Sequence, residues 1–252
     1  MTSPRTWTAA LLIIGDEILS GRTQDKNVAQ IASWLNVQGI RLSEVRVVPD
    51  VEARIVAAVQ ALRQESDYLF TTGGIGPTHD DITVDAIAAA VGVGVVVHPD
   101  ARAILERYYA TRGGLTEARL RMARVPEGAE LIVNPVSGAP GIRWQNIFIL
   151  AGVPHITAGM LAGLTGQIEG GRPIVSVTVG AMAPESEVAD LLRETERSTA
   201  GVSIGSYPFF REGKTGANFV VRSEDGELAQ ATADLLAASL ESAGYPAVPG
   251  GI

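Results

Sequence analysis

The sequence predicts an α/β protein, in which a three-layer domain with a mostly parallel sheet is followed by a small α+β domain. Strand-like and helix-like segments alternate up to residue 164. The strand-like segments are continuous apolar runs, which is typical of strands buried on both faces of a parallel sheet. With 252 residues, of which 46% are hydrophobic and 19% charged, the chain can bury a core that offsets the entropy lost on ordering.

The first domain begins with three strand–helix pairs and ends with a return to the sheet. Apolar residues recur at helical spacing after the first strand, until Gly39 ends that helix. The predicted strands are residues 9–14, 40–48, 68–72, 93–97 and 147–150. The predicted helices are residues 28–35, 51–62, 82–91, 99–112, 117–123 and 155–164.

A glycine-rich segment with one proline, residues 165–173, is the predicted linker. We therefore place the domains at residues 1–168 and 172–252. The second domain is predicted to have the order β-α-β-β-α, which is typical of a small α+β unit. Its elements are a strand at 174–179, a helix at 185–198, a hairpin of 202–207 and 219–222, and a helix at 227–243.

Composition excludes several classes of function. The chain has no cysteine, which excludes disulfides, thiolate metal sites and a cysteine nucleophile, and its three histidines are dispersed. Any metal would therefore be a hard ion held by oxygen, such as Mg²⁺, Mn²⁺ or Co²⁺. The longest apolar stretch, residues 86–97, is far shorter than the roughly 20 residues that cross a bilayer. We expect a cytoplasmic protein that does not bind membranes.

The net charge of −8 argues against nucleic acid as a partner, because phosphate backbones are repelled at long range. Residues 213–216 match the GXXG loop of KH domains. In those domains the loop joins two helices, whereas here it lies between two predicted strands, so we expect no RNA binding. We expect instead a small phosphate-bearing ligand and a homo-oligomer.

The strongest motif is a glycine-rich segment, residues 71–81, which follows a predicted buried strand. Its glycines are Gly73, Gly74 and Gly76, and a helix begins within ten residues. Backbone amides can approach a ligand closely at glycines, and a helix N-terminus favours an anion. The segment also ends in Asp80 and Asp81. One of them could cap the helix, but two adjacent carboxylates repel each other, which favours a functional reading.

Carboxylates also follow the first two predicted strands, as Asp16 with Glu17 and as Asp50. In an open parallel sheet the carboxyl ends of the strands line the ligand crevice. Each Asp taken alone is a common cap or turn residue. Because three strand ends carry such groups, we expect Asp16, Asp50 and the Gly73 segment to converge on one site.

These segments resemble the MoaB/Mog-like molybdopterin-binding family, and most closely the domain at the front of CinA proteins. The order, spacing and length of the matching motifs agree across about residues 8–165. The segment after residue 170 is similar, more weakly, to the KH-like domain that follows in CinA. The matching pieces are residues 14–21, Asn27, residues 73–81, residues 134–141 and residues 152–154.

The resemblance implies a phosphate-bearing pterin or nucleotide as ligand. In members that adenylylate molybdopterin, an Asp after the first strand and another after the second are catalytic, which correspond to Asp16 and Asp50. In CinA-like members the fold is associated with metal-dependent hydrolysis of ADP-ribose-like diphosphates. We expect catalysis by Asp16, Asp50 and Asp81, and a divalent metal at Asp16, Asp80 and Asp81. The expected ligand-binding residues are Gly15, Glu17, Asn27, Gly73, Gly74, Gly76, Pro77, Thr78, Ser137, Gly138, Ala139, Pro140, Gly152 and Pro154.

The chain departs from CinA-like sequences in two places that bear on the ligand. Residues 137–141 replace the usual Gly-Thr-Ala-Pro-Gly, and Met122 stands where a polar residue is usual. Arg119, Arg121 and Arg124 precede that stretch and could pair with a diphosphate or simply favour a helix dipole.

Two functions of different class stay open. One is a metal-dependent nucleotide pyrophosphatase of the ADP-ribose type, in which residues 73–78 anchor the diphosphate and carboxylates hold the metal. The other is a non-catalytic molybdopterin- or nucleotide-binding module, or a molybdenum cofactor biosynthesis protein. Carboxylates that face an anionic ligand require a cation between them, which favours metal dependence.

Overall fold

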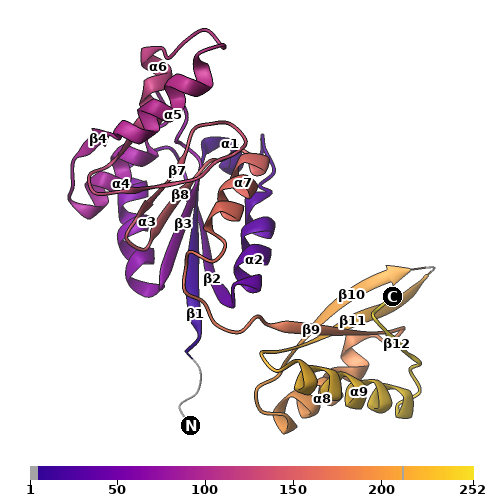
Figure 1. The fold of residues 1–252 in the computed structure, drawn as a ribbon. Coiled ribbons are helices and arrows are strands. Elements are labelled where there is room, and N and C mark those ends of the chain that lie inside the picture. Colours follow the sequence, from indigo (N-terminus) through magenta and orange to yellow (C-terminus); the bar gives the residue numbers. More distant parts are fainter. Residues whose placement is uncertain (1–4, 212) are drawn as a thin grey trace. The chain divides into compact units, whose positions relative to one another are not determined.

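The structure is a computed structural model that describes residues 5–211 and 213–252 (Figure 1). The chain divides into two compact units, one ending at Gly171 and the other comprising Arg172–Ile252. Each unit has its own hydrophobic core.

The first unit is built on a six-stranded sheet with the order β2-β1-β3-β8-β7-β6. The first four strands in that order are parallel, whereas β7 is antiparallel to both β8 and β6. The carboxyl ends of the four parallel strands therefore lie at one edge. The strands are β1 (Trp7–Ile14), β2 (Ile40–Val48), β3 (Tyr68–Thr72), β6 (Glu130–Ile132), β7 (Gly141–Trp144) and β8 (Ile147–Leu150).

Helices cover both faces of this sheet, which gives three layers (Figure 1). On one face, Ala10, Leu12 and Ile14 of β1 pack in a core with α3 (Glu52–Glu65) and α4 (Thr83–Val91). On the other face, the alternate β1 residues pack with α2 (Asn27–Val37) and α7 (Pro154–Leu164). This arrangement confirms the predicted α/β fold with a mostly parallel sheet.

A small lobe is inserted between α4 and β6. It consists of the antiparallel pair β4 (Val95–Val97) and β5 (Arg124–Pro126) with α5 (Pro99–Tyr109), α6 (Glu117–Leu120) and a 3-10 helix, η1 (Arg121–Ala123). Its core is the cluster of Ala101, Leu105 and Ala123. The lobe brings Tyr109 and Met122 to the candidate site described below.

The second unit is α+β, as predicted. Its antiparallel sheet has the order β10-β11-β9-β12, and α8 and α9 pack against it. The hairpin of β10 and β11 corrects one expectation, because residues 214–216 do not join the two strands but lie in β11, where they pair with β10. The elements are β9 (Val175–Ala181), α8 (Glu185–Ser198), β10 (Ser203–Arg211), β11 (Lys214–Ser223), α9 (Gly226–Ser242) and β12 (Ala247–Pro249).

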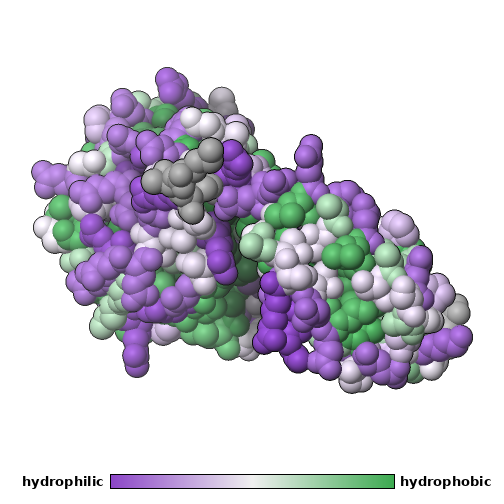
Figure 2. Space-filling model, turned by 90° about the horizontal axis from the view of Figure 1, so that it is seen from below, coloured by the Kyte–Doolittle hydropathy of each residue, from purple (hydrophilic) through white to green (hydrophobic). Residues whose placement is uncertain are grey.

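On the face seen in Figure 2, the N-terminal unit carries many hydrophilic side chains, and the C-terminal unit shows apolar patches among hydrophilic ones. Exposed apolar side chains of that unit are Val175, Tyr207, Phe210, Leu235 and Val248. Among the described residues, none of the helices has the length and apolar character needed to cross a bilayer.

Candidate functional site

The loops that follow β1 and β2 are joined by a hydrogen bond between two predicted site residues. The backbone N–H of Asp16, at the start of α1 (Asp16–Leu19), donates to Asp50 Oδ2 over 2.9 Å. Asp50 does not cap α3, because the cap residue is Val51 and the helix has no side-chain cap. The predicted convergence of Asp16 and Asp50 at the sheet edge is therefore confirmed.

The Asp50 carboxyl has a raised pKa. Partial burial is the largest cause, because it penalises the charged form. The carboxylates of Asp16, Glu17 and Asp80 raise the pKa further, while the hydrogen bond from the Asp16 N–H opposes them. Three acidic side chains on the neighbouring loops thus disfavour the charged form of Asp50, which favours a proton or a cation beside it.

The glycine-rich loop after β3 requires glycine at its first two positions. Gly73 has a φ of 100°, and a Cβ there would lie 2.0 Å from the backbone oxygen of Ile14. Gly74 has a φ of 64°, and a Cβ there would lie 2.2 Å from Thr83 Oγ1. Thr83 Oγ1 donates to the Gly73 carbonyl over 2.9 Å, and its N–H donates to the Gly74 carbonyl over 3.1 Å. The first residue of α4 therefore fixes the shape of the loop.

Asp81 closes the far end of this loop. Its Oδ2 accepts from the Thr78 N–H over 2.7 Å and also from the Thr78 hydroxyl. It does not cap α4, because the cap residue is Ile82 and no side chain caps that helix. Asp81 therefore stabilises the turn through its Oδ2. Its Oδ1 has no partner among the described residues.

The amide N–H groups of Gly74, Ile75 and Gly76 have no hydrogen-bond partner within the described part of the chain. Three successive unpaired donors on a loop before a helix form a site that suits an anion.

These amides lie on the wall of a cavity of about 570 Å³. Its lining residues come from the loops after β1, β3 and β8, from α7, from the inserted lobe and from residues 134–140. Ten predicted ligand-binding or catalytic residues line the cavity: Glu17, Gly73, Gly74, Gly76, Pro77, Asp81, Ser137, Ala139, Gly152 and Pro154.

Asn134, which is 9% exposed, organises the loop that carries Ser137 and Ala139. Its Nδ2 donates to Ser137 Oγ over 2.7 Å and to the Ala139 carbonyl over 2.6 Å. Its Oδ1 accepts from the Val136 N–H over 3.0 Å. Gly138 lies in the same loop with a φ of 76° and, like Pro140, does not line the cavity.

The remaining predicted residues lie beside the cavity. Asp16 lines a shallow open hollow together with Glu17 and Arg22. Thr78 and Asp80 are exposed, and the buried Gly15 lies against the Glu17 carboxylate. Asn27 lines a smaller cavity of about 60 Å³ that adjoins the large one.

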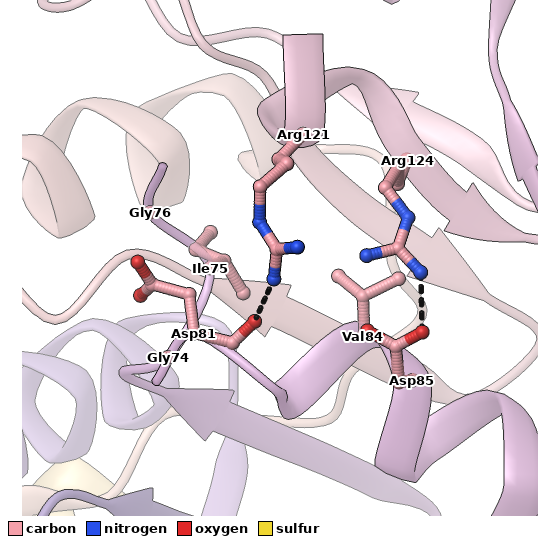
Figure 3. A pocket seen from close by; sticks show the side chains of 8 residues that line it. All are labelled: Gly74, Ile75, Gly76, Asp81, Val84, Asp85, Arg121 and Arg124. Carbon is pink, nitrogen blue, oxygen red and sulfur yellow. Dashed lines mark hydrogen bonds and ion pairs between the residues drawn. The ribbon is translucent and has the colours of Figure 1, made fainter. Parts of the chain in front are cut away.

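The three arginines have different roles, and Figure 3 shows two of them, Arg121 and Arg124. Arg121 donates to the backbone carbonyl of Asp81 over 3.3 Å, and its buried Nε has no partner among the described residues. Arg124 is paired with Asp85. Arg119 donates to the carbonyls of Arg112 and Gly114 and lies over the Tyr109 ring. Only Arg121 therefore both contacts the Asp81 segment and keeps an unused donor.

In the range 5–211 and 213–252, no three histidine or carboxylate side chains are grouped so that they could hold a metal ion by themselves. The assignment of Asp16, Asp80 and Asp81 as metal ligands stays a prediction. Their hard oxygen donors fit Mg²⁺, which proteins commonly hold with one or two carboxylates plus substrate phosphates.

Sequence reasoning missed most of the apolar half of the cavity. Ile75 and Val153 lie inside motifs that the sequence identified, Met122 was noticed only as a departure from a pattern, and nothing in the local sequence marks the other five as site residues. The additional lining residues are Thr23, Ile75, Tyr109, Met122, Ala151, Val153, Ile156 and Met160. A wall of this kind fits the flat or apolar part of a ligand whose anionic part meets the loop amides.

Comparisons with known proteins agree with this architecture. The family described as "probable molybdopterin binding domain" matches residues 10–169, and the FAD synthase middle domain matches residues 173–247. A protein from Aeropyrum pernix is 35% identical over 246 residues, covering 93% of this chain and 91% of the relative.

Further relatives carry the CinA name. A CinA-like protein from Desulfosudis oleivorans is 35% identical over 210 residues, covering 78% of this chain and 51% of that protein, so this chain spans about half of its length. The crystal structure of a CinA protein of unknown function from Thermoplasma acidophilum is 34% identical, with a TM-score of 0.60, and covers 64% of this chain and 99% of that one. The chain therefore belongs to the molybdopterin-binding-domain family and is CinA-like.

Proposed function

We propose that this protein binds a nucleotide-type diphosphate at the carboxyl edge of its parallel sheet and hydrolyses it with the help of a divalent cation. The observation that carries the proposal is the row of three amides on residues 74–76, which have no partner among the described residues and belong to the wall of the 570 Å³ cavity. The amides supply hydrogen bonds to phosphate oxygens without any charged side chain.

The acidic rim accounts for the cation. A diphosphate bound at the loop would add negative charge beside Asp50, whose pKa is already raised by burial and by the nearby carboxylates. A divalent ion held by Asp16, Asp80 and Asp81 would neutralise this charge when bound and make the bridging oxygen a better leaving group.

Asp50 is the proposed proton acceptor. A carboxyl whose pKa is raised accepts a proton more readily than an ordinary one, which suits a general base that acts near neutral pH. Water attacks one phosphorus atom, a proton of the water passes to Asp50, and the P–O–P bond breaks. The products are two monophosphates.

The test is hydrolysis of ADP-ribose with and without Mg²⁺, Mn²⁺ or Co²⁺, with the two products separated by chromatography. We expect turnover only with a divalent ion, and loss of turnover in EDTA. Asp50→Asn should reduce the rate at least about tenfold while ADP-ribose still binds. Glu194→Gln, an exposed position on α8 in the other unit, is the matched control and should leave the rate unchanged.

A non-catalytic binding module is the second candidate. It is favoured by the engagement of Asp81 in loop closure and by the lack of a three-carboxylate grouping in the described residues. If calorimetry shows equally tight binding of ADP-ribose in EDTA, and no ion supports cleavage, this candidate replaces the hydrolase.

A further inference from the structure

Arg121 is a partly buried arginine that forms no ion pair with any described carboxylate. The other two arginines of its segment are engaged, because Arg124 is paired with Asp85 and Arg119 donates to two backbone carbonyls. A partly buried charge without an opposite charge beside it destabilises the folded state. Arg121 is therefore the cation of this segment that an anionic ligand would stabilise.

The three nitrogens of the Arg121 guanidinium have different environments. Nη2 donates to the Asp81 carbonyl over 3.3 Å. Nε is buried and has no partner among the described residues, so a ligand does not reach it. Nη1 also has no partner among these residues, but it does not belong to the buried atoms. Nη1 is thus the nitrogen that a ligand can contact.

The rest of the side chain holds this free nitrogen in place. Arg121 is the first residue of η1 in the inserted lobe, and its bond to Asp81 joins the lobe to the segment that follows the glycine loop. Figure 3 shows the side chain extending toward Asp81, with Ile75 beside it. Because the guanidinium is planar, the Nη2 bond and the burial of Nε also orient Nη1. A donor that is oriented in advance loses little entropy when a ligand binds.

Arg121 lines a small pocket of about 10 Å³ together with Gly74, Ile75, Gly76 and Asp81. The last four residues also line the 570 Å³ cavity, so the small pocket adjoins the wall that carries the three loop amides. A volume of this size holds about one water molecule, and a phosphate oxygen is similar in size. One oxygen of a phosphoryl group bound at the loop can therefore enter the pocket.

Two carboxylates line the same pocket, and the protein offsets their charges. Asp85 is paired with Arg124. Asp81 accepts from the N–H and the hydroxyl of Thr78, and hydrogen bonds of this kind stabilise a charged carboxylate. Arg121 therefore supplies the positive charge that an anion meets in the pocket.

We propose that Arg121 is a phosphate-binding residue, which donates from Nη1 to an oxygen of one phosphoryl group while Nη2 holds the Asp81 carbonyl. Hydrogen bonds from arginine to phosphate are charge-assisted and are among the stronger ones in proteins. The inference rests on the proposed function only in placing a diphosphate at the loop amides. It adds that the inserted lobe recognises the charge of the ligand together with the loops that follow the strands.

Calorimetry with inorganic pyrophosphate in the presence of Mg²⁺ tests this assignment. Arg121→Gln should weaken binding at least about tenfold, the order expected for the loss of a hydrogen bond between charged groups. Arg121→Lys should weaken it by about two- to tenfold, because an ammonium keeps the charge but lacks the planar fork that serves two acceptors. Arg107→Gln is the matched control, since it removes an exposed cation of α5 in the same lobe, and it should bind pyrophosphate like wild type.

Thermal unfolding monitored by circular dichroism accompanies each titration. A lower melting temperature of Arg121→Gln with unchanged affinity for pyrophosphate would make Arg121 a purely structural link and overturn the assignment. Equal losses of affinity in Arg121→Gln and Arg107→Gln would also overturn it, because the effect would then be one of net charge. If Arg121→Gln does not fold, Arg121→Lys decides, and binding of pyrophosphate as tight as in wild type would contradict the proposed contact.

The outcome is separable from that of the proposed function. Wild-type protein that does not bind pyrophosphate with Mg²⁺ would overturn the role of Arg121 even if ADP-ribose were cleaved. Binding that depends on Arg121 without cleavage of ADP-ribose leaves the assignment in place and counts against the hydrolase alone.

Discussion

At Asp50, the environment that suits the proposed chemistry also lowers the stability of the fold. Its carboxyl is partly buried and lies near Asp16, Glu17 and Asp80, so its pKa is raised. Between the ordinary value and the raised value the folded state binds more protons than the unfolded state. Stability therefore falls as pH rises through this window and stays lower above it.

Asp50→Asn should remove this effect. The amide oxygen can still accept the Asp16 N–H, and no charge is left to repel. We expect the melting temperature of the variant to exceed that of wild type by about 1–3 °C at pH 7, and the difference to narrow toward pH 4. Thermal unfolding monitored by circular dichroism over this range checks it. A variant less stable than wild type at pH 7 would show that the carboxylate is stabilising.

Asp16 and Asp81 can be separated by their structural roles. The Asp16 side chain is exposed and makes no hydrogen bond among the described residues, so Asp16→Asn should fold normally. Asp81→Asn keeps one acceptor for the Thr78 N–H and should also fold, whereas Asp81→Ala opens the turn. Both Asn variants should lose at least about tenfold in ADP-ribose hydrolysis. Circular dichroism and turnover are measured together, and unfolding of both Asn variants would assign these residues a purely structural role.

At the scale of the element, the glycine loop is the segment that tolerates change least. Gly73→Ala places a Cβ 2.0 Å from the Ile14 carbonyl oxygen at a positive φ. Strain and overlap together should cost about 2–5 kcal/mol and displace the loop amides, so ADP binding is lost with stability.

Gly92→Ala is its control, since Gly92 has a φ of 76° and nothing lies within 4 Å of the added Cβ. It should cost only about 1–2 kcal/mol and leave binding unchanged. Denaturant unfolding and calorimetry measure the two effects. Equal losses in the two variants would mean that the positive φ and not the close approach limits the loop.

The elements that could be predicted are those whose pattern is long enough to be unambiguous. The prediction of 40–48, 68–72 and 147–150 as strands is confirmed at both ends, because the last two are runs of apolar or β-branched residues and the first alternates apolar with polar side chains. The helix predicted at 99–112 ends at Tyr109, and the one predicted at 117–123 is a single α turn followed by η1.

Short elements were missed for a physical reason. β5, β6 and β12 have three residues each and β7 has four, so their sequences carry no period, and α1 is a single turn. Pairing partners from elsewhere in the chain make these segments strands. The hairpin strands β10 and β11 also extend further than predicted, to Arg211 and from Lys214.

At the scale of the whole molecule, the polar side of the site was predictable and the apolar side was not. Asp16, Asp50 and the glycine loop follow strands, and the topology of a parallel sheet brings strand ends together. Tyr109 and Met122 reach the cavity only through the packing of an inserted lobe. The buried Thr72 hydroxyl has no partner among the described residues, and this could not be predicted because it is a property of the packed core.

The division into two units leads to the last prediction. Every residue that lines either cavity belongs to the unit that ends at Gly171. None of the core clusters of the described residues draws on both units. The Thermoplasma acidophilum structure, matched over 99% of its own length, corresponds to only 64% of this chain.

A fragment of residues 1–171 should therefore fold alone and bind ADP within about twofold of the affinity of the full chain, since domains with separate cores usually fold independently. Circular dichroism establishes whether the fragment folds, and calorimetry measures its affinity for ADP. The Asp50→Asn variant is measured both in the fragment and in the full chain. A folded fragment that binds ADP more than tenfold more weakly than the full chain would show that residues 172–252 contribute to the site.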